Sequence, residues 1–256
     1  MSAVVPYQTE LLSDPAWAGF QLRRLLSPAP RPVNSHGPRP NPFSPWDKRL
    51  ELKGLAQHVV LLNKYPVEPG HLLLISRGWQ PQSGWLTMAD WLAVSELWEQ
   101  HRGLWFFNSG PVAGASQPHR HLQLLPRPGD SSFCPQAEVF TAALAGEQPA
   151  WLDHPLSCLP LPQAQRPKAE ELAQLYAQLA AAEGLGDPRR DPQPLRPYNL
   201  LISPDWFALV PRSKEGHAGF NINALGFAGY LLVSSETALD WLRSHGPNQL
   251  LAEVVG

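Results

Sequence analysis

The sequence contains few cysteines and no excess of charge of either sign. Cys134 and Cys158 are the two cysteines among 256 residues, and the formal net charge is -2 at pH 7. Two cysteines so far apart provide neither a disulfide framework nor the spacing of a zinc site, and they are typical of a reducing compartment. A near-neutral chain also lacks the basic field with which proteins bind nucleic-acid polymers. The net charge therefore predicts no nucleic-acid partner. Small anionic ligands remain possible, because a few local cations are enough to bind them.

Long hydrophobic runs are also missing. No stretch approaches the ~18 apolar residues of a transmembrane helix, and the opening MSAVVPYQTELLSDPAW has no basic segment followed by an apolar run. We therefore expect no membrane partner and a cytoplasmic location. The sequence has neither Gly-x-Gly-x-x-Gly nor the Walker-type Gly-x-x-x-x-Gly-Lys, which excludes the dinucleotide-binding and P-loop phosphate sites.

Proline and tryptophan, by contrast, are abundant, with 29 and 10 residues respectively. Prolines cluster at residues 28–32 and 38–42, where we expect extended connections because proline fixes φ and removes a hydrogen-bond donor. The tryptophans most simply serve packing.

Strand and helix patterns alternate along the chain. Residues 87–100 predict a helix, because Thr87 can cap its start and Asp90 can complete a capping box. The apolar runs at 58–67 and 70–76 are close enough in sequence to form antiparallel neighbours. Further strands are predicted at 104–107, 119–125, 197–203, 206–211 and 229–235, further helices at 168–183 and 235–243, and an irregular proline-rich segment at 128–165.

A faint internal similarity supports two related halves. Residues 69–76 read PGHLLLIS and residues 228–235 read AGYLLVSS, and each precedes a helix opened by Ser or Thr. The pair fits two copies of a strand-strand-helix unit, but a chance likeness of two short apolar strands explains it equally well.

The stretch QPHRHLQLL carries the strongest chemical signal. Side chains on a strand alternate between its faces, so His119, His121 and Gln123 share one face and Arg120 points to the other. Because apolar residues follow, we expect a buried strand whose polar face looks into a site, since unpaired buried imidazoles and amides would be costly.

Three interpretations of the two histidines stay open. Both rings could be structural, satisfied by nearby carbonyl groups. They could form a metal site, since His-x-His is a common ligand pair, but Asp130 is the first acidic residue downstream, so a distant residue such as His217 would have to complete it. The interpretation that we favour is nucleophilic catalysis, because a neutral imidazole attacks phosphorus well near pH 7. A backbone carbonyl could then hold the proton on the other ring nitrogen.

The segment before the histidines, NSGPVAGASQPH, is rich in small residues. Gly110, Gly114 and Ala115 would let backbone N–H groups converge on an anion, and Ser116 and Gln117 add side-chain donors. Without the adjacent histidines, the default interpretation would be a tight turn alone.

The segment FFNSGPVAGASQPHRHLQLLP closely resembles the active-site segment of the ATP adenylyltransferases, also called diadenosine tetraphosphate phosphorylases. These enzymes form the His-x-His-x-Gln branch of the histidine-triad superfamily. Blocks similar to the same family recur in the same order at residues 41–47, 58–77, 197–203, 209–215 and 222–235, so the resemblance covers most of the chain.

The resemblance implies an α+β fold with an antiparallel sheet and flanking helices. It predicts one two-lobed, histidine-triad-like domain over residues 1–256, with related halves at about 1–130 and 165–256 joined by the proline-rich segment 131–164.

The resemblance also implies a reaction. Diadenosine tetraphosphate, and in some members the triphosphate, reacts with inorganic phosphate to give ATP or ADP plus ADP through an adenylyl group carried by His121. Gln123 stands where the hydrolytic enzymes have their last histidine; an amide cannot titrate, so the intermediate should wait for phosphate rather than water. The alternatives are a dinucleoside polyphosphate hydrolase, a non-catalytic nucleotide-binding protein of the same fold, and a sugar-nucleotide transferase, whose usual metal-ligand cysteines and histidines this chain lacks.

The implied site residues follow from the matching positions. His121 would be the nucleophile, assisted by His119 and Gln123. The expected substrate contacts are Lys64, Asn108, Ser109, Gly114, Ala115, Ser116, Gln117, Asn199, Arg212, Lys214 and Asn223. The plain alternatives are surface solvation for the three cations and turn chemistry for the asparagines.

One departure concerns the N-terminal segment FQLRRLLSPAPRPV, which lacks the lysine usual in the family, so Arg31 is a candidate to replace it. We expect no tightly bound cofactor and no dedicated metal site, because any Mg²⁺ would travel with the nucleotide. The expected partners are diadenosine polyphosphates, ATP, ADP and phosphate, and the sequence gives no sign of an oligomer.

Overall fold

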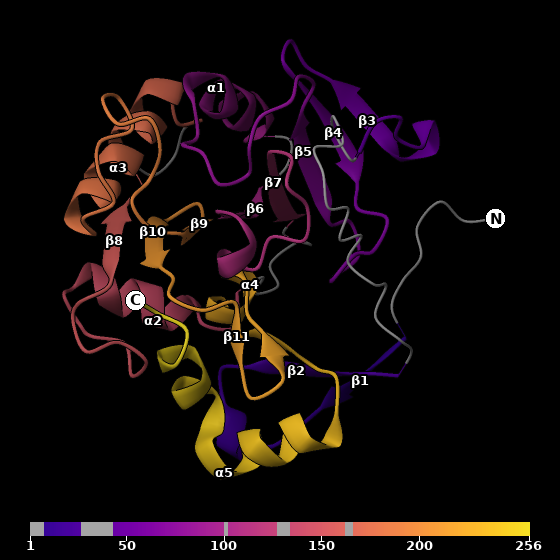
Figure 1. The fold of residues 1–256 in the computed structure, drawn as a ribbon, viewed down its shortest axis with the longest axis vertical. Coiled ribbons are helices and arrows are strands. Elements are labelled where there is room, and N and C mark those ends of the chain that lie inside the picture. The colour runs from indigo at the N-terminus through magenta and orange to yellow at the C-terminus, as the bar shows by residue number, and fades with distance from the viewer. Residues whose placement is uncertain (1–7, 27–42, 100–101, 127–133, 162–165) are drawn as a thin grey trace.

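A single antiparallel sheet organises the computed structural model, which describes residues 8–26, 43–99, 102–126, 134–161 and 166–256 (Figure 1). Its eight strands run in the spatial order β3 (Glu51–Gly54), β4 (His58–Leu62), β5 (Leu72–Ser76), β7 (His121–Pro126), β6 (Gly103–Asn108), β9 (Tyr198–Ile202), β10 (Trp206–Pro211) and β8 (Ser157–Pro160). The pairing of β6 with β9 places Asn108 opposite Asn199 and joins the two parts of the chain in one sheet. The α+β fold with an antiparallel sheet is confirmed.

Alternate residues of the central strands point into separate cores on the two faces of the sheet, as the period of a buried strand requires. Trp105 and Phe107 point to one face, where α1 (Met88–Leu97) and α3 (Ala169–Ala182) pack. The predicted start of α1 is confirmed, because Thr87 and Asp90 form its capping box. Gly184, with a φ of +62°, follows α3 as expected of a helix end.

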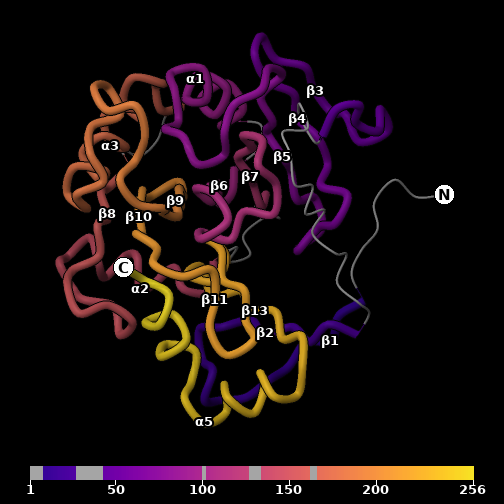
Figure 2. The backbone as a smooth tube through the Cα atoms, viewed as in Figure 1, coloured from indigo at the N-terminus to yellow at the C-terminus, as the bar shows by residue number. Residues whose placement is uncertain are grey.

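The other face carries Leu104 and Phe106 and is covered by one helix from the middle of the chain and by elements from both ends. These are α2 (Ala137–Leu144), α4 (Ala224–Phe227), α5 (Glu236–Ala252) and a three-stranded sheet of β1 (Thr9–Leu12), β2 (Gln21–Leu25) and β13 (Tyr230–Val233). Figure 2 shows the indigo N-terminal strands beside the yellow C-terminal helix. The remaining short elements are the hairpin β11 (Gly216–His217) and β12 (Phe220–Asn221) and the 3-10 turns η1 (Pro15–Trp17), η2 (Lys48–Leu50) and η3 (Pro111–Ala113).

The structure differs from the sequence-based expectations at three places. The segment predicted to be irregular contains α2 and β8; α2 has no proline, and the proline of β8 is its last residue, Pro160. The last helix runs beyond Arg243 to Ala252, with a break at Gly246 (φ +78°) before Pro247. The similarity between residues 69–76 and 228–235 is not a structural repeat: β5 lies inside the main sheet, whereas β13 pairs in parallel with β2 in the small one.

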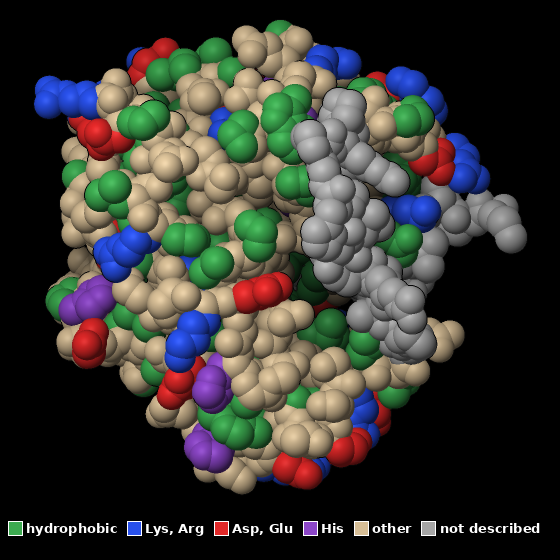
Figure 3. Space-filling model, viewed as in Figure 1, with side chains coloured by type: hydrophobic (Ala, Val, Ile, Leu, Met, Phe, Trp, Pro, Cys, Tyr) green, Lys and Arg blue, Asp and Glu red, His purple; other side chains and the backbone are tan. Residues whose placement is uncertain are grey.

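Charged side chains are mixed in sign on the face that Figure 3 shows, with no single-sign patch there. Among the described residues, no helix has both the length and the apolar composition to cross a membrane.

Candidate active site

His121 begins β7, and a backbone hydrogen bond sets the state of its ring. Its Nδ1 lies 2.8 Å from the carbonyl oxygen of His119. A carbonyl oxygen only accepts, so Nδ1 carries the proton and Nε2 keeps its lone pair. Burial lowers the pKa of the His121 ring to about 4, although the hydrogen bond to His119 opposes this shift. The ring is therefore neutral at pH 7, in the tautomer that nucleophilic attack by Nε2 requires.

His119 lies just before β7 rather than inside it, in an isolated bridge with Pro81. The strand was predicted to start two residues too early. Its Nε2 donates to the carbonyl oxygen of Ser76 at 2.7 Å, which fixes the ring. Phe43 packs edge-on against both rings, with centroid distances of 6.0 Å to His119 and 5.3 Å to His121. The two histidines thus share one face as predicted.

Arg120 points to the opposite face, also as predicted. Its Nη1 lies 3.2 Å from Asp90 of α1, which in turn lies 2.9 Å from Nε2 of His58. Burial alone would raise the pKa of the Asp90 carboxyl, but the hydrogen bond with His58 and the charge of Arg120 outweigh it and hold the pKa below its usual value. The buried group fastens the start of α1 to the backbone between the two histidines.

Gln123 is held by a histidine that the sequence analysis missed. The Oε1 atom of Gln123 lies 3.0 Å from Nε2 of His71, which donates to it. Nδ1 of His71 faces two donors at 3.3 Å, the backbone N–H of Val67 and the amide of Asn63, which fixes the neutral tautomer. Burial lowers the pKa of His71 to about 4. With its oxygen engaged, Gln123 turns its amide N–H₂ group away from His71, where it can donate to a ligand.

Gln82, also missed, grips the backbone of His121 from both sides. Its Oε1 accepts from the His121 N–H at 2.8 Å, and its Nε2 donates to the carbonyl oxygens of His121 at 3.1 Å and Asn108 at 2.8 Å. The side chain is only 1% exposed. The β6–β7 pairing ends at Phe106 and Gln123, so the backbone of His121 has no partner on β6. The Gln82 side chain takes the place of that partner, and its hydrogen bonds hold the His121 backbone in position.

The bend between β6 and His119 is built as a packed turn. Gly110 and Gly114 have φ values of +82° and +83°, and a Cβ at Gly114 would lie 2.6 Å from the Ile222 carbonyl oxygen. The N–H groups of Ala113 and Ala115 both donate to the Gly110 carbonyl, so they do not converge on an anion as expected. Within the described residues, Ser116 and Gln117 have no hydrogen-bond partner, and they are the donors of the bend that a ligand could meet.

Three predicted contact residues instead form a buried polar strut. Asn199 donates to Asn108 Oδ1 at 2.9 Å, and the same oxygen accepts from the Ala224 N–H at 2.9 Å. Arg212 is 1% exposed. Its guanidinium donates to five oxygens of the protein: Asn199 Oδ1 and the carbonyl groups of Lys214, Glu215, Ile222 and Val254. The structure places Arg212, predicted as a substrate contact, inside the fold, where each N–H group of its guanidinium is bonded to the protein.

The remaining predicted contacts are scattered. Lys214 pairs with Glu253 at 3.4 Å on the surface. Lys64 is exposed beside the ring of Tyr65. Ser109 is buried at the end of β6 and donates through its backbone to Tyr198. Asn223 caps α4 through its side chain. Arg31 lies outside the described residues.

Among the residues that the structure describes, no third ligand supports the metal interpretation. His217, the distant candidate, contacts Glu253 at 3.7 Å and the ring of Trp241. Within the described part of the chain, no three His, Cys, Asp or Glu side chains are grouped to hold a metal ion.

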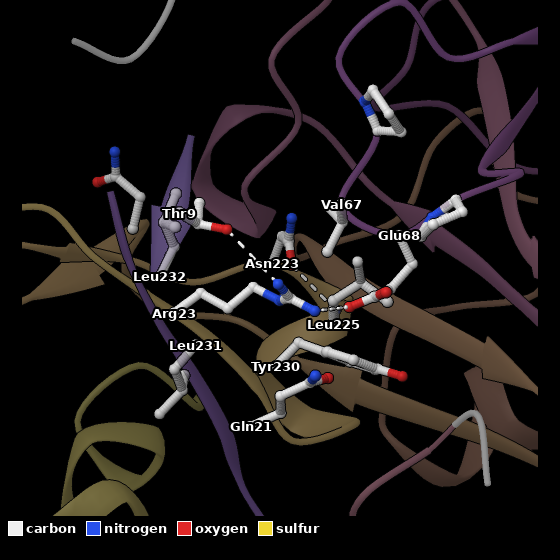
Figure 4. Close-up of a pocket in the computed structure, with 13 residues that line it drawn as sticks. Thr9, Gln21, Arg23, Val67, Glu68, Asn223, Leu225, Tyr230, Leu231 and Leu232 are labelled. Carbon is white, nitrogen blue, oxygen red and sulfur yellow. Dashed lines mark hydrogen bonds and ion pairs between the residues drawn. The ribbon is translucent and has the colours of Figure 1, made fainter. Parts of the chain in front are cut away.

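A cavity of about 670 Å³ lies between the two sheets' connecting elements, with no residue of β7 in its lining (Figure 4). It is bounded by the small sheet, the loop 66–69 and the start of α4. Its lining residues are Thr9, Gln21, Arg23, Pro66, Val67, Glu68, Pro69, Asn221, Asn223, Leu225, Tyr230, Leu231 and Leu232.

Comparison with known proteins identifies relatives over nearly the whole chain. Residues 27–141 match the family model of the Ap4A phosphorylase N-terminal domain, and residues 140–256 match that of the ATP adenylyltransferase C-terminal domain. Diadenosine 5',5'''-P1,P4-tetraphosphate phosphorylase 2 of Saccharomyces cerevisiae is 29% identical over 91% of this chain and 82% of its own length. Protein APA1 of the same yeast is 32% identical over 69% of this chain and 61% of its own length.

Solved structures of a yeast phosphorylase are similar to this chain over nearly its whole length. The crystal structure of yeast Ap4A phosphorylase Apa2 superposes with a TM-score of 0.70 and 26% identity, covering 99% of this chain and 89% of that one. The structure of its complex with AMP superposes with a TM-score of 0.71 and 27% identity, covering 99% of this chain and 91% of that one. The structure of its complex with Ap4A superposes with a TM-score of 0.69 and 25% identity, covering 98% of this chain and 90% of that one.

The polar strut yields a stability prediction. Arg212→Met leaves five acceptors without their donor, three of them in buried hydrogen bonds, so we expect the free energy of unfolding to fall by at least about 3 kcal/mol. The control Lys214→Met removes an exposed ion pair and should cost less than about 1 kcal/mol. Chemical denaturation measures both. Equal small losses in the two variants would contradict the structural role of Arg212.

Proposed function

The chain belongs to the ATP adenylyltransferase family of diadenosine tetraphosphate phosphorylases, and from this premise we propose that His121 carries the adenylyl group while phosphate cleaves diadenosine tetraphosphate into ATP and ADP. The observation that supports His121 best is its neutral ring, with Nδ1–H bonded to the His119 carbonyl at 2.8 Å. That bond leaves Nε2 as the nucleophile.

In the first step, Nε2 of His121 attacks the α-phosphorus of the nucleotide. The new P–N bond forms as the bond from this phosphorus to its bridging oxygen breaks, and that oxygen leaves with the rest of the molecule as ATP. The leaving polyphosphate is a stable anion, so it needs little protonation. The developing positive charge on the ring is shared with the His119 carbonyl through Nδ1–H.

In the second step, an oxygen of hydrogen phosphate attacks the same phosphorus. The electrons of the P–N bond return to Nε2, ADP is released, and the proton of the attacking hydrogen phosphate passes to solvent. The residues around His121 favour phosphate over water as the acceptor, because Gln123 cannot remove a proton from water. The neighbouring His71 cannot readily do so either: its Nε2 already donates to Gln123, and its Nδ1 is occupied by two donors.

The donors for the phosphate oxygens would come from the Gln123 amide and from Ser116 and Gln117 in the bend. The mechanism uses no resident cofactor, and any Mg²⁺ would arrive with the nucleotide, whose phosphate oxygens are its usual ligands. His119 has a positioning role: its backbone carbonyl fixes the tautomer of His121, and its own ring is fixed by Ser76.

Replacement of His121 tests the proposal. His121→Ala should lower kcat for phosphorolysis by more than about 10³-fold, because the nucleophile is removed, while thermal unfolding stays close to that of the unaltered protein. His154→Ala, which changes an exposed histidine, is the control.

Products are resolved with and without phosphate. ATP plus ADP, formed only with phosphate, is the expected result, and ATP plus AMP without phosphate would show hydrolysis instead. Substantial turnover by His121→Ala would rule out the covalent intermediate on this residue.

Gln82 gives a second prediction. In Gln82→Ala the backbone of His121 loses both of its side-chain hydrogen bonds, and a shift of about 1 Å at Nε2 should lower kcat about 10²-fold with little change in KM. Gln80→Ala, two residues away and exposed, should behave as the unaltered protein. Steady-state kinetics of both variants measures kcat and KM. An unchanged kcat in Gln82→Ala would show that β7 positions His121 without the Gln82 side chain.

A further inference from the structure

We propose that a second, polar cavity, on the side of the main sheet that carries α1, is a non-catalytic binding site for inorganic phosphate in its protonated form, hydrogen phosphate. The cavity measures about 240 Å³ and lies between the start of α1 and the adjacent ends of β4 and β5. It is smaller than the sites of drug-sized ligands, which measure about 300–1,000 Å³, so its ligand is a small one. The lining residues that carry the argument are His58, Arg77, Ala89, Asp90 and Arg120.

His58 provides an acceptor that the protein leaves unused. Its ring is 2% exposed, and its Nε2 lies 2.9 Å from Asp90. Burial opposes ionisation of Asp90, but the hydrogen bond with His58 and the charge of Arg120 hold the pKa of its carboxyl below the usual value, so the group only accepts hydrogen bonds at neutral pH. In the neutral ring, Nε2 therefore carries the proton and Nδ1 keeps its lone pair. Nδ1 has no hydrogen-bond partner among the described residues, so a donor for it has to come from the cavity that the ring lines.

Arg77 and the start of α1 provide donors that are also unused. Arg77 is exposed and donates through Nε to the Leu55 carbonyl at 3.1 Å, whereas its two terminal nitrogens have no partner in the described part of the chain. The N–H of Ala89 belongs to the first turn of α1, where a helix has no acceptors of its own, and no described residue accepts from it. The positive end of the helix dipole adds to the attraction for an anion.

The negative charge of Asp90 is offset inside the protein. Its two oxygens accept from His58, from the N–H and hydroxyl of Thr87 at 2.7 and 2.9 Å, and from Nη1 of Arg120 at 3.2 Å. Arg120 is itself 2% exposed, so the two opposite charges form a buried pair. The charge that remains at the cavity is that of Arg77.

These groups select a ligand that both donates and accepts. Hydrogen phosphate has a P–OH group that can donate to Nδ1 of His58, and charged oxygens that can accept from Arg77 and Ala89. Sulfate has the same shape but carries no proton at neutral pH, so it would place an oxygen lone pair against that of Nδ1. Arg120 and His121 point to opposite faces, so a phosphate held here is not the acceptor of the adenylyl group.

Histidine rings report the cavity and the reaction centre separately in ¹H–¹⁵N NMR spectra of histidine-labelled protein at pH 7. His58, assigned with His58→Gln, reports the cavity, and His121 reports the reaction centre. Without nucleotide, inorganic phosphate should shift Nδ1 of His58 in a saturable way by about 10 mM, where a site of millimolar affinity is largely filled. By the same signal, sulfate should bind at least about 10-fold more weakly.

Two variants and AMP separate the sites further. Arg77→Met should weaken phosphate binding at His58 about 10- to 100-fold and leave the response of His121 unchanged. Lys53→Met is the matched control, because Lys53 carries the same charge on nearby β3 but pairs with Glu96 at 2.9 Å outside the cavity lining; it should change neither response. Saturating AMP, whose phosphate would occupy the reaction centre, should abolish the response of His121 alone.

Several results would overturn the assignment. Absence of a saturable shift at His58 would show that water alone fills the cavity, and a doubly protonated His58 ring or equal responses to phosphate and sulfate would show that Nδ1 does not select a P–OH group. Equal losses in Arg77→Met and Lys53→Met would reduce the effect to general surface charge. Loss of the His58 response together with that of His121 on addition of AMP would show a signal relayed from the reaction centre instead of a separate site.

Discussion

The hydrogen bond from Nδ1 of His121 to the His119 carbonyl is the interaction on which the rest of the site depends. It chooses one tautomer of a ring whose two nitrogens are otherwise similar, and burial keeps that ring neutral by lowering its pKa to about 4. The hydrogen bond can form because its donor and acceptor are only two residues apart in the chain. The ring of His119 is bonded to the Ser76 carbonyl, which keeps the acceptor residue in place. Gln82 then fixes the His121 backbone, and the nucleophilic nitrogen is placed by contacts to main-chain atoms rather than by a charged partner.

A second constraint is the seam between β6 and β9, where the two parts of the chain meet in one sheet. Asn108 and Asn199 lie opposite each other there, and Arg212 and the N–H of Ala224 complete the network. Burial lowers the pKa of Arg212 to about 10, so this arginine is still charged at neutral pH. A buried charge surrounded by neutral acceptors is tolerated because each donor is satisfied. This network bonds Asn199 to Ala113 in the bend and Asn108 to the first residue of α4. The hydrogen bonds that stabilise the fold therefore also fix the position of the bend beside the site.

Local patterns predicted the parts that depend on local chemistry. Thr87 and Asp90 marked the start of α1, and the alternation in QPHRHLQLL placed His119, His121 and Gln123 on one face with Arg120 on the other. Residues whose roles arise only from tertiary contacts were missed or misplaced. Gln82 lies in an irregular link and acts because two strand ends meet beside it. Arg212 looks like an exposed cation in PRSK, yet β10 carries it into the interior. His71 could have been found, because strand 70–76 was predicted and an antiparallel neighbour places His71 near Gln123.

The state of the His121 ring tests the account most directly, and it can be read by ¹H–¹⁵N NMR on histidine-labelled protein, with His121→Ala used for assignment. The account predicts one proton, on Nδ1, in the free protein at pH 7 and still at about pH 5, above the pKa of about 4. In the intermediate trapped without phosphate, it predicts the adenylyl group on Nε2. A proton on Nε2, a doubly protonated ring at pH 7, or an adenylyl group on Nδ1 would contradict it.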